Sequence, residues 1–85
     1  MHVWFSTHLR AYTGGAETEV DGATVMAVVD ELERRHRGFK FRIVDEQDRI
    51  REHIIIFRNQ EQVKDLREAV APTDKLRLMG ALSGG

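Results

Sequence analysis

The feature that most constrains the fold is one run of helical periodicity in a chain whose other segments resemble short strands and turns. Val25, Val28, Val29 and Leu32 are spaced to form one apolar stripe on an α-helix. Thr24 precedes the stripe and suits the N-cap position, because its hydroxyl can accept a hydrogen bond from a free N–H of the first turn. A helix with a single apolar face has to be buried against other elements, and strands flank it on both sides.

Several segments have the composition of β-strands. β-Branched and aromatic residues predict strands at 2–6, 53–59 and 75–79, and 16–20 is expected to return from the first strand as a hairpin. Side chains alternate between the two faces of a strand, so Val3 and Phe5 are expected on one face and Trp4 on the other.

The connections are predicted from turn residues. Glycine and proline indicate turns at 13–15 and 71–74, and Gly38 is expected to end the helix. We further expect a turn at 60–62, a short edge strand at 63–66, and a connecting segment at 39–52 that places apolar groups under the sheet. Phe39, Phe41 and Ile43 alternate as in a strand, whereas Phe39 and Ile43 alone also fit a helical turn.

This order of elements predicts an α+β fold. A hairpin, a helix and further strands fit a small mixed sheet of four to five strands packed on one main helix, which is the β-grasp or ubiquitin-like arrangement. The chain has 85 residues, so we expect one domain over 1–80 and a short flexible tail, 81–85, that ends in Gly-Gly.

Composition argues against several classes of partner. The 13 basic and 14 acidic residues give a net charge of −1, which argues against a nucleic-acid partner. No apolar run approaches the roughly 20 residues that span a bilayer, and the N-terminus lacks a signal-peptide pattern. The absence of cysteine excludes disulfides and fits a cytoplasmic location. A monomer with transient partners is expected.

A set of motifs in order carries a family resemblance. "THLRAYTGG" follows the first strand, "DGATV" begins the helix, "HIIIFRN" forms the third strand, and "GG" ends the chain. In this order the motifs resemble the MoaD/ThiS family of ubiquitin-like sulfur carrier proteins over nearly the whole chain. The chain departs from the family pattern at Arg58, at Gln60, at Ser83, and at Gly80, where relatives often have proline.

The resemblance implies a function for the C-terminus. Gly85 would be adenylated on its α-carboxylate by an ATP-dependent, ubiquitin-activating-type enzyme and converted to a thiocarboxylate. A second enzyme would then accept the sulfur in molybdopterin, thiamin, cysteine or thiolated-tRNA synthesis. The chain itself would be a protein co-substrate or the small subunit of a synthase complex, with no catalytic residue and no bound cofactor. ATP would be used by the activating partner.

The tail composition suits this chemistry. Glycine lacks a Cβ, so Gly84 permits bending and Gly85 leaves the acyl carbon unhindered. Five extended residues span at most about 17 Å, which is enough to enter an enzyme's active site. Ala81, Leu82, Ser83 and Gly84 are therefore expected to thread that site.

Alternation also predicts a docking patch. If Ile54, Ile56, Leu76 and Leu78 face the core, then Ile55, Phe57 and Met79 form an apolar patch near the base of the tail. In the opposite register Phe57 would belong to the core. Arg58 would point inward in the first register and would have to extend to the edge of the sheet.

Two further groups of residues bear on binding. His2, His8, His36 and His53 lack metal-ligand spacing, so no metal site is expected. The basic run 34–42 either contacts an anion or an acidic partner, or it is a solvated helix end, and the second reading is the commoner one.

Two alternatives to the carrier function stay open. The chain could be a ubiquitin-like modifier joined through Gly85 to lysines of other proteins, or a β-grasp interaction module with an inert tail. Conjugates in native cells would favour the modifier, and an unchanged function after deletion of Gly84 and Gly85 would favour the inert tail.

Overall fold

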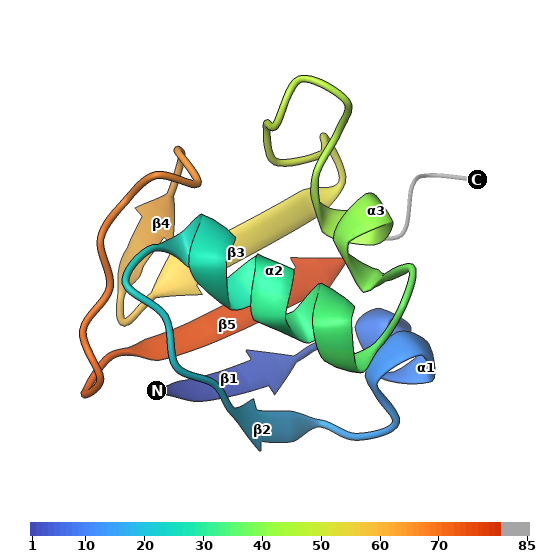
Figure 1. Cartoon of the computed structure of the whole chain (residues 1–85), viewed down its shortest axis with the longest axis horizontal. Coiled ribbons are helices and arrows are strands. Elements are labelled where there is room, and N and C mark those ends of the chain that lie inside the picture. The colour runs from blue at the N-terminus through green and yellow to red at the C-terminus, as the bar shows by residue number, and fades with distance from the viewer. Residues whose placement is uncertain (81–85) are drawn as a thin grey trace.

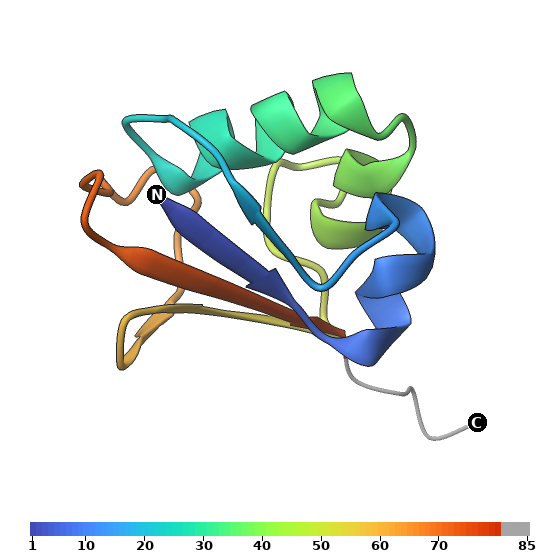
Figure 2. The ribbon, with the colours of Figure 1, turned by 90° about the horizontal axis from the view of Figure 1, so that it is seen from below.

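The computed structural model describes residues 1–80, which form one mixed sheet with helices on one face (Figures 1 and 2). The strands are β1 (His2–Phe5), β2 (Glu17–Glu19), β3 (Ile54–Arg58), β4 (Glu61–Val63) and β5 (Lys75–Gly80). The helices are η1 (Thr7–Leu9), α1 (Arg10–Thr13), α2 (Val25–Arg35) and α3 (Phe39–Ile43). The sheet order is β2-β1-β5-β3-β4, with β1 parallel to β5 and the other pairs antiparallel. The predicted α+β arrangement, a mixed sheet packed on one main helix, is confirmed.

Helix α2 forms as its sequence predicts. The Thr24 hydroxyl accepts a hydrogen bond from the Ala27 N–H at 3.1 Å, and all four residues of the apolar stripe are fully buried. The prediction for Gly38 was wrong, because α2 ends at Arg35 with His36 as its C-cap. Gly38 instead takes a φ of 95° as the N-cap of α3, a conformation that glycine adopts without steric cost.

The core lies between α2 and the inner face of the sheet. Val3 and Phe5 of β1 are buried, whereas Trp4 lies on the outer face, as alternation predicts. Ile56, Leu76 and Leu78 are also buried from β3 and β5, so the predicted register is confirmed. Phe5 packs edge to face against Phe39 with ring centroids 5.6 Å apart.

The connection from β1 to β2 is more structured than a simple hairpin turn. The turn at 13–15 is present, with Gly14 at a φ of 72°, but η1 and α1 precede it. Leu9 is buried in this segment, and the Arg10 Nε donates a hydrogen bond to the Phe5 carbonyl at 3.0 Å. These two contacts hold the short helical turns against the end of β1.

The connecting segment 39–52 contains the short helix α3. Phe39 and Ile43 are fully buried, whereas the side chain of Phe41 is 65% exposed. The segment therefore follows the helical spacing of Phe39 and Ile43, and the strand-like alternation that includes Phe41 does not describe it.

The predicted turn at 60–62 and edge strand at 63–66 were wrong. The turn is Asn59–Gln60, and β4 runs over Glu61–Val63 with Val63 opposite Ile56. Asn59 adopts a φ of 57°, which asparagine tolerates better than most residues. Beyond β4, the backbone N–H groups of Lys64 and Asp65 donate to the Glu68 carboxylate instead of a strand partner.

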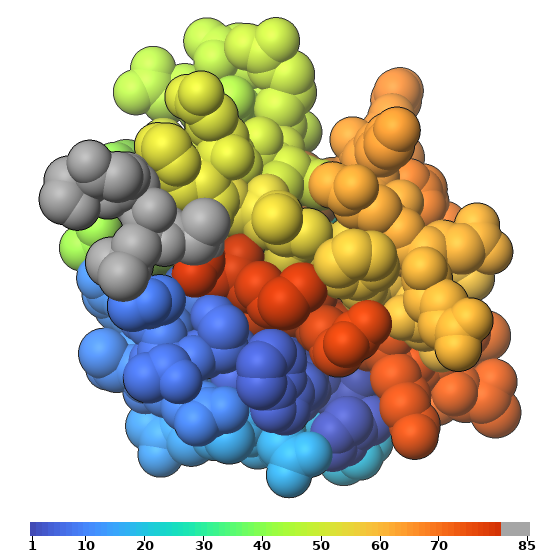
Figure 3. Space-filling view, turned by 180° about the vertical axis from the view of Figure 1, so that it is seen from behind, coloured from blue at the N-terminus to red at the C-terminus, as the bar shows by residue number. Residues whose placement is uncertain are grey.

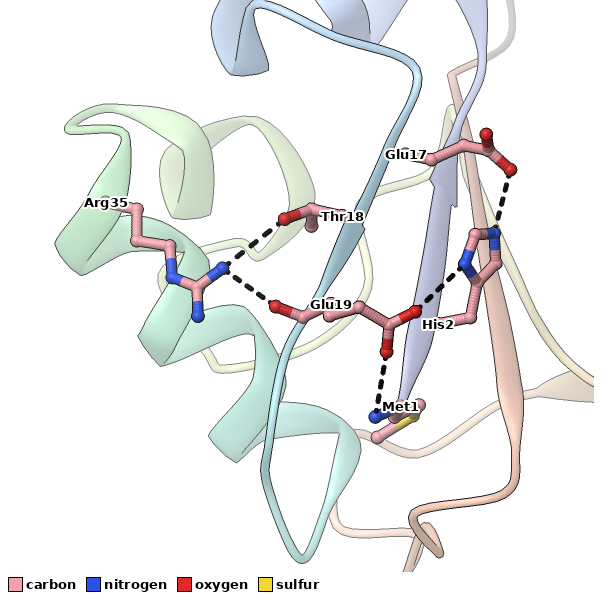
Figure 4. Close-up of polar contacts among 6 residues, drawn as sticks. All are labelled: Met1, His2, Glu17, Thr18, Glu19 and Arg35. Atoms are coloured by element: carbon pink, nitrogen blue, oxygen red, sulfur yellow. Dashed lines mark hydrogen bonds and ion pairs between the residues drawn. The ribbon is translucent and has the colours of Figure 1, made fainter.

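A polar network ties the edge strand β2 to its neighbours (Figure 4). The two ring nitrogens of His2 lie 2.9 Å from Glu17 and 3.4 Å from Glu19. From the other side, Arg35 donates to the Glu19 carbonyl at 2.9 Å. These contacts add to the backbone pairing of β2 with β1, in a three-residue strand that contributes little to the core.

Candidate functional site at the end of strand β5

The predicted reactive residue lies outside the described part of the chain. Gly85 and the predicted threading residues Ala81, Leu82, Ser83 and Gly84 all follow Gly80, the last described residue. The structure therefore describes where the tail begins and which surfaces surround that point.

The tail begins at a firmly held position. Strand β5 is the middle strand of the sheet, and Gly80 pairs with Ile54 of β3. On the other side, the Gly80 N–H donates to the Ser6 hydroxyl at 2.9 Å, and the Ser6 N–H donates to the Leu78 carbonyl at 3.0 Å. Proline could not donate the first of these bonds, so the departure from the family pattern at Gly80 has a physical use here.

The predicted docking patch lies together on the outer face of the sheet. Ile55 and Met79 are paired directly across β3 and β5, and Ile55 is 37% exposed. Phe57 is half-buried on the same face, opposite Arg77, whose guanidinium lies 5.2 Å from its ring centroid. In Figure 3, which shows this face, β5 runs between β1 and β3. The register thus places all three residues outside the core.

The sequence did not assign Trp4 to this surface. Trp4 pairs with Arg77 across β1 and β5, and the guanidinium of Arg10 lies 5.4 Å from its ring centroid. A groove beside the patch is lined by His2, Trp4, Asn59, Gln60, Lys75, Leu76, Arg77 and Met79. The outer face is therefore both apolar and basic, and the alternation in β1 was the signal that could have included Trp4.

Arg58 has the inward direction that the register predicts. It shares the core face of β3 with Ile56, and its Nη1 lies 3.7 Å from Asp74 at the edge. Its Nε is buried and has no hydrogen-bond partner among the described residues. The side chain thus extends to a carboxylate at the sheet edge.

A second hollow, which we call the tail-root cleft, lies where α1, α3 and the end of β5 meet. Its lining includes Tyr12, Phe41, Arg42, Arg51, His53 and Gly80. Figures 1 and 2 show α1 and α3 together at this end of the sheet. No single sequence motif indicates this cleft, because its residues come from four separate segments.

The carboxyl groups with lowered pKa values are used in structural contacts. Hydrogen bonds from Arg34 and Arg35 lower the pKa of Glu31 to about 2, and hydrogen bonds from Arg67 lower that of Asp65 to about 2. The pKa of Asp74 is lowered chiefly by the Ala71 N–H. These carboxylates hold local structure, and none of them lines the tail-root cleft.

The described residues offer no metal site or membrane span. Within residues 1–80, no group of three or more histidine, aspartate or glutamate side chains is arranged to hold a metal ion. In the same range, no helix is long and apolar enough to cross a membrane.

Sequence comparisons identify the family. The ThiS family model matches residues 3–85. The sulfur carrier protein CysO of Mycobacterium bovis is 31% identical, over 93% of this chain and 91% of that protein. CysO of Mycobacterium tuberculosis matches with the same identity and coverage.

Solved structures agree with this assignment. A chain in the Amycolatopsis orientalis BexX/CysO complex superposes with a TM-score of 0.89 at 35% identity, covering 99% of this chain and 98% of that one. SAMP1 from Haloferax volcanii superposes with a TM-score of 0.80 at 32% identity, covering 100% and 98% of the two chains. The first of these structures is a complex of a similar chain with a partner protein. The chain therefore belongs to the ThiS family of β-grasp proteins, and its sulfur-carrier relatives there are protein carriers rather than enzymes.

Proposed function

We propose that this protein is a sulfur carrier whose Gly85 carboxylate is adenylated and then converted to a thiocarboxylate. The supporting observation is that the sheet's middle strand, β5, ends at Gly80 and is followed directly by "ALSGG". The pairing of β5 on both sides gives the tail a rigid base, and the family match extends to residue 85.

The chemistry requires little from the carrier. A carboxylate oxygen of Gly85 attacks the α-phosphorus of ATP, which forms an acyl adenylate and releases pyrophosphate. A sulfide equivalent from a donor then attacks the acyl carbon, and AMP leaves with its bonding electrons. The developing negative charges are stabilised by donors and metal in the activating enzyme. The carrier provides an unhindered carboxylate and a surface by which it is held.

The docking patch of Ile55, Phe57 and Met79 is the proposed holding surface. It lies on β3 and β5, beside the base of the tail, so an enzyme seated on it would be placed to receive residues 81–85. A cluster of partly exposed apolar residues is typical of partner surfaces, and methionine adapts to different partners. The same patch would serve the activating enzyme and the sulfur-accepting enzyme in turn.

Cysteine biosynthesis is the proposed destination of the sulfur. The resemblance alone leaves molybdopterin, thiamin, cysteine and thiolated tRNA open. The similarity to CysO carriers, at 31% identity over most of both chains, favours cysteine among these. The cytoplasm is the proposed site of this reaction.

Intact-mass spectrometry tests the proposal. The untagged protein is incubated with ATP, a sulfide source and the adenylating enzyme encoded in the same genome. We expect the mass increase that replaces one oxygen of Gly85 by sulfur, and no increase in a matched chain that lacks Gly84 and Gly85. A plain carboxylate that persists under these conditions would contradict the proposal.

A protein modifier is the second candidate. It is favoured by the similarity to SAMP1 from Haloferax volcanii. A second solved structure from that organism, which is also similar to this chain, is named small archaeal modifier protein 1. The modifier shares the adenylation step but transfers the acyl group to a lysine amine. Immunoblots of native cells would separate the two functions, because only the modifier gives Gly85-dependent bands of higher mass.

A further inference from the structure

Nine of the ten arginines among residues 1–80 fall into two groups. Five lie in ion pairs with carboxylates: Arg34, Arg35, Arg49, Arg58 and Arg67. Four others lie over aromatic rings and have no carboxylate within ion-pair distance among residues 1–80: Arg10, Arg42, Arg51 and Arg77. Two of this second group, Arg42 and Arg51, line the tail-root cleft at the end of β5, whereas Arg10 and Arg77 lie over Trp4 and Phe57 on the outer face of the sheet.

Two of these stacked pairs form the walls of the tail-root cleft. The guanidinium of Arg42 lies 4.7 Å from the ring centroid of Tyr12, and that of Arg51 lies 4.6 Å from the centroid of Phe41. Tyr12 and Phe41 are 38% and 65% exposed, and the structure gives only one other large apolar residue, Ile55, as exposed within residues 1–80. Aromatic residues and arginine are enriched at protein–protein interfaces, and tyrosine and arginine are enriched at their hot spots.

The Arg51 side chain is held in place before any partner arrives. Its Nε donates to the Phe41 carbonyl, and its backbone N–H donates to the Ile43 carbonyl at 2.9 Å. Among residues 1–80 the terminal nitrogens of this guanidinium make no hydrogen bond, and the side chain lines the cleft. A fixed guanidinium of this kind suits bidentate binding of a carboxylate and loses less side-chain entropy on binding.

The charged side chains that line the cleft are of one sign. They are Arg42 and Arg51, and no aspartate or glutamate of the described residues lines it. The acidic groups with arginine partners, such as Glu31 and Asp65, lie on α2 and in the loop after β4. Although the net charge of the chain is −1, the region around the end of β5 is therefore basic.

We propose that the tail-root cleft binds an acidic, partly apolar segment of the enzyme that receives the tail. The proposal rests on the proposed function, since it assigns the cleft to that enzyme. Carboxylates of the segment would bind Arg42 and Arg51, and its apolar side chains would cover Tyr12 and Phe41. Because the cleft adjoins the docking patch through the Ile54–Gly80 pair, one enzyme can contact both surfaces while the tail enters its active site.

An NMR titration of the full-length, isotope-labelled chain tests the affinity of the cleft. The probe is a blocked synthetic peptide of glutamate and leucine, and the control peptide has glutamine in place of glutamate. We expect shifts at Tyr12, Phe41, Arg51 and Gly80 with the acidic peptide, weakened at high salt because exposed charges are screened. The double variant Arg42→Gln/Arg51→Gln should bind about tenfold more weakly.

The matched control is the double variant Arg34→Gln/Arg67→Gln, which removes the same charge from the ion-paired group. It should bind the acidic peptide like the unaltered chain. Equal shifts with the glutamine peptide, equal loss in the control variant, or tighter binding of oligothymidylate would each overturn the proposal. The last result would instead indicate stacking of nucleic-acid bases on the rings.

A kinetic measurement separates this proposal from the function on which it rests. With the adenylating enzyme of the same genome, the cleft variant should lower kcat/KM for pyrophosphate release about tenfold at low salt, and the control variant should leave it unchanged. Full kcat/KM in the cleft variant would overturn the role of the cleft while charging still proceeds. If the proposed function is wrong, neither the variants nor the unaltered chain is adenylated at Gly85.

Discussion

The side of the molecule covered by α2 and the side at which β5 ends use similar residues in opposite ways. On the helix side, arginines neutralise carboxylates and apolar residues are fully buried, as Glu31 with Arg34 and Leu32 illustrate. On the β5 side, arginines stack on rings, and Ile55 and Phe41 stay exposed. The first side is complete by itself, whereas the second has the exposed groups that a partner could cover.

The largest expected effect comes from the helix side. Leu32→Ala removes a fully buried side chain from the middle of the core, so the free energy of unfolding should fall by about 2–5 kcal/mol. Urea denaturation followed by circular dichroism measures this loss. Ile55→Ala, on the other side, should change the free energy of unfolding by much less. An equal loss would contradict the contrast between the two sides.

The next effect tests the β5 side for binding. Phe57→Asp replaces a half-buried residue of the docking patch and should raise the Kd for the adenylating enzyme at least about tenfold. Calorimetric titration measures the Kd, and circular dichroism checks that the fold is retained. Unfolding of this variant would show that Phe57 serves the core, contrary to the exposed register of β3.

A smaller effect is expected at the junction of the body and the tail. Ser6→Ala removes the hydroxyl that accepts the Gly80 N–H, so stability should fall by about 1 kcal/mol. Amide hydrogen exchange at Gly80 should become faster, while exchange within α2 stays unchanged. Uniformly faster exchange would mean that this bond supports the whole fold and not the base of the tail.

The smallest effect concerns the ion pairs of the helix side. The pKa of Glu31 is lowered from 4.5 to about 2 by Arg34 and then Arg35, so its contribution to stability is complete above pH 4.5 and is lost as pH falls toward 2. Thermal unfolding of Glu31→Gln should therefore show a smaller drop in Tm over that pH range. Glu46→Gln, which alters an exposed loop glutamate, should keep the full drop.

The parts of the fold that depend on local sequence were predictable. The stripe of Val25, Val28, Val29 and Leu32 defines α2 without reference to the rest of the chain, and alternation in β3 and β5 gave the correct register. Helix α3 was ambiguous because five residues, "FKFRI", fit two periodicities, and only burial of Phe39 and Ile43 decides between them.

The candidate site was predictable only where it follows a strand. Ile55, Phe57 and Met79 could be placed on one face from alternation alone. The tail-root cleft could not, because Tyr12, Phe41, Arg51 and Gly80 are brought together by tertiary packing of separate segments. The basic run 34–42 proved to be divided, since Arg34 and Arg35 pair with Glu31 whereas Arg42 stacks on Tyr12.

The parallel pairing of β1 with β5 has a consequence for how the protein is made. His2 aligns with Lys75 and Phe5 with Leu78, so the middle of the sheet joins the earliest and the latest described segments to be synthesised. A ribosome-bound chain that stops before β5 lacks the strand between β1 and β3, so neither of these strands has its β5 partner. Contacts so distant in sequence also slow folding. An incomplete product therefore lacks both the central strand of the sheet and Met79 of the docking patch, so the outer face is completed only when synthesis reaches β5.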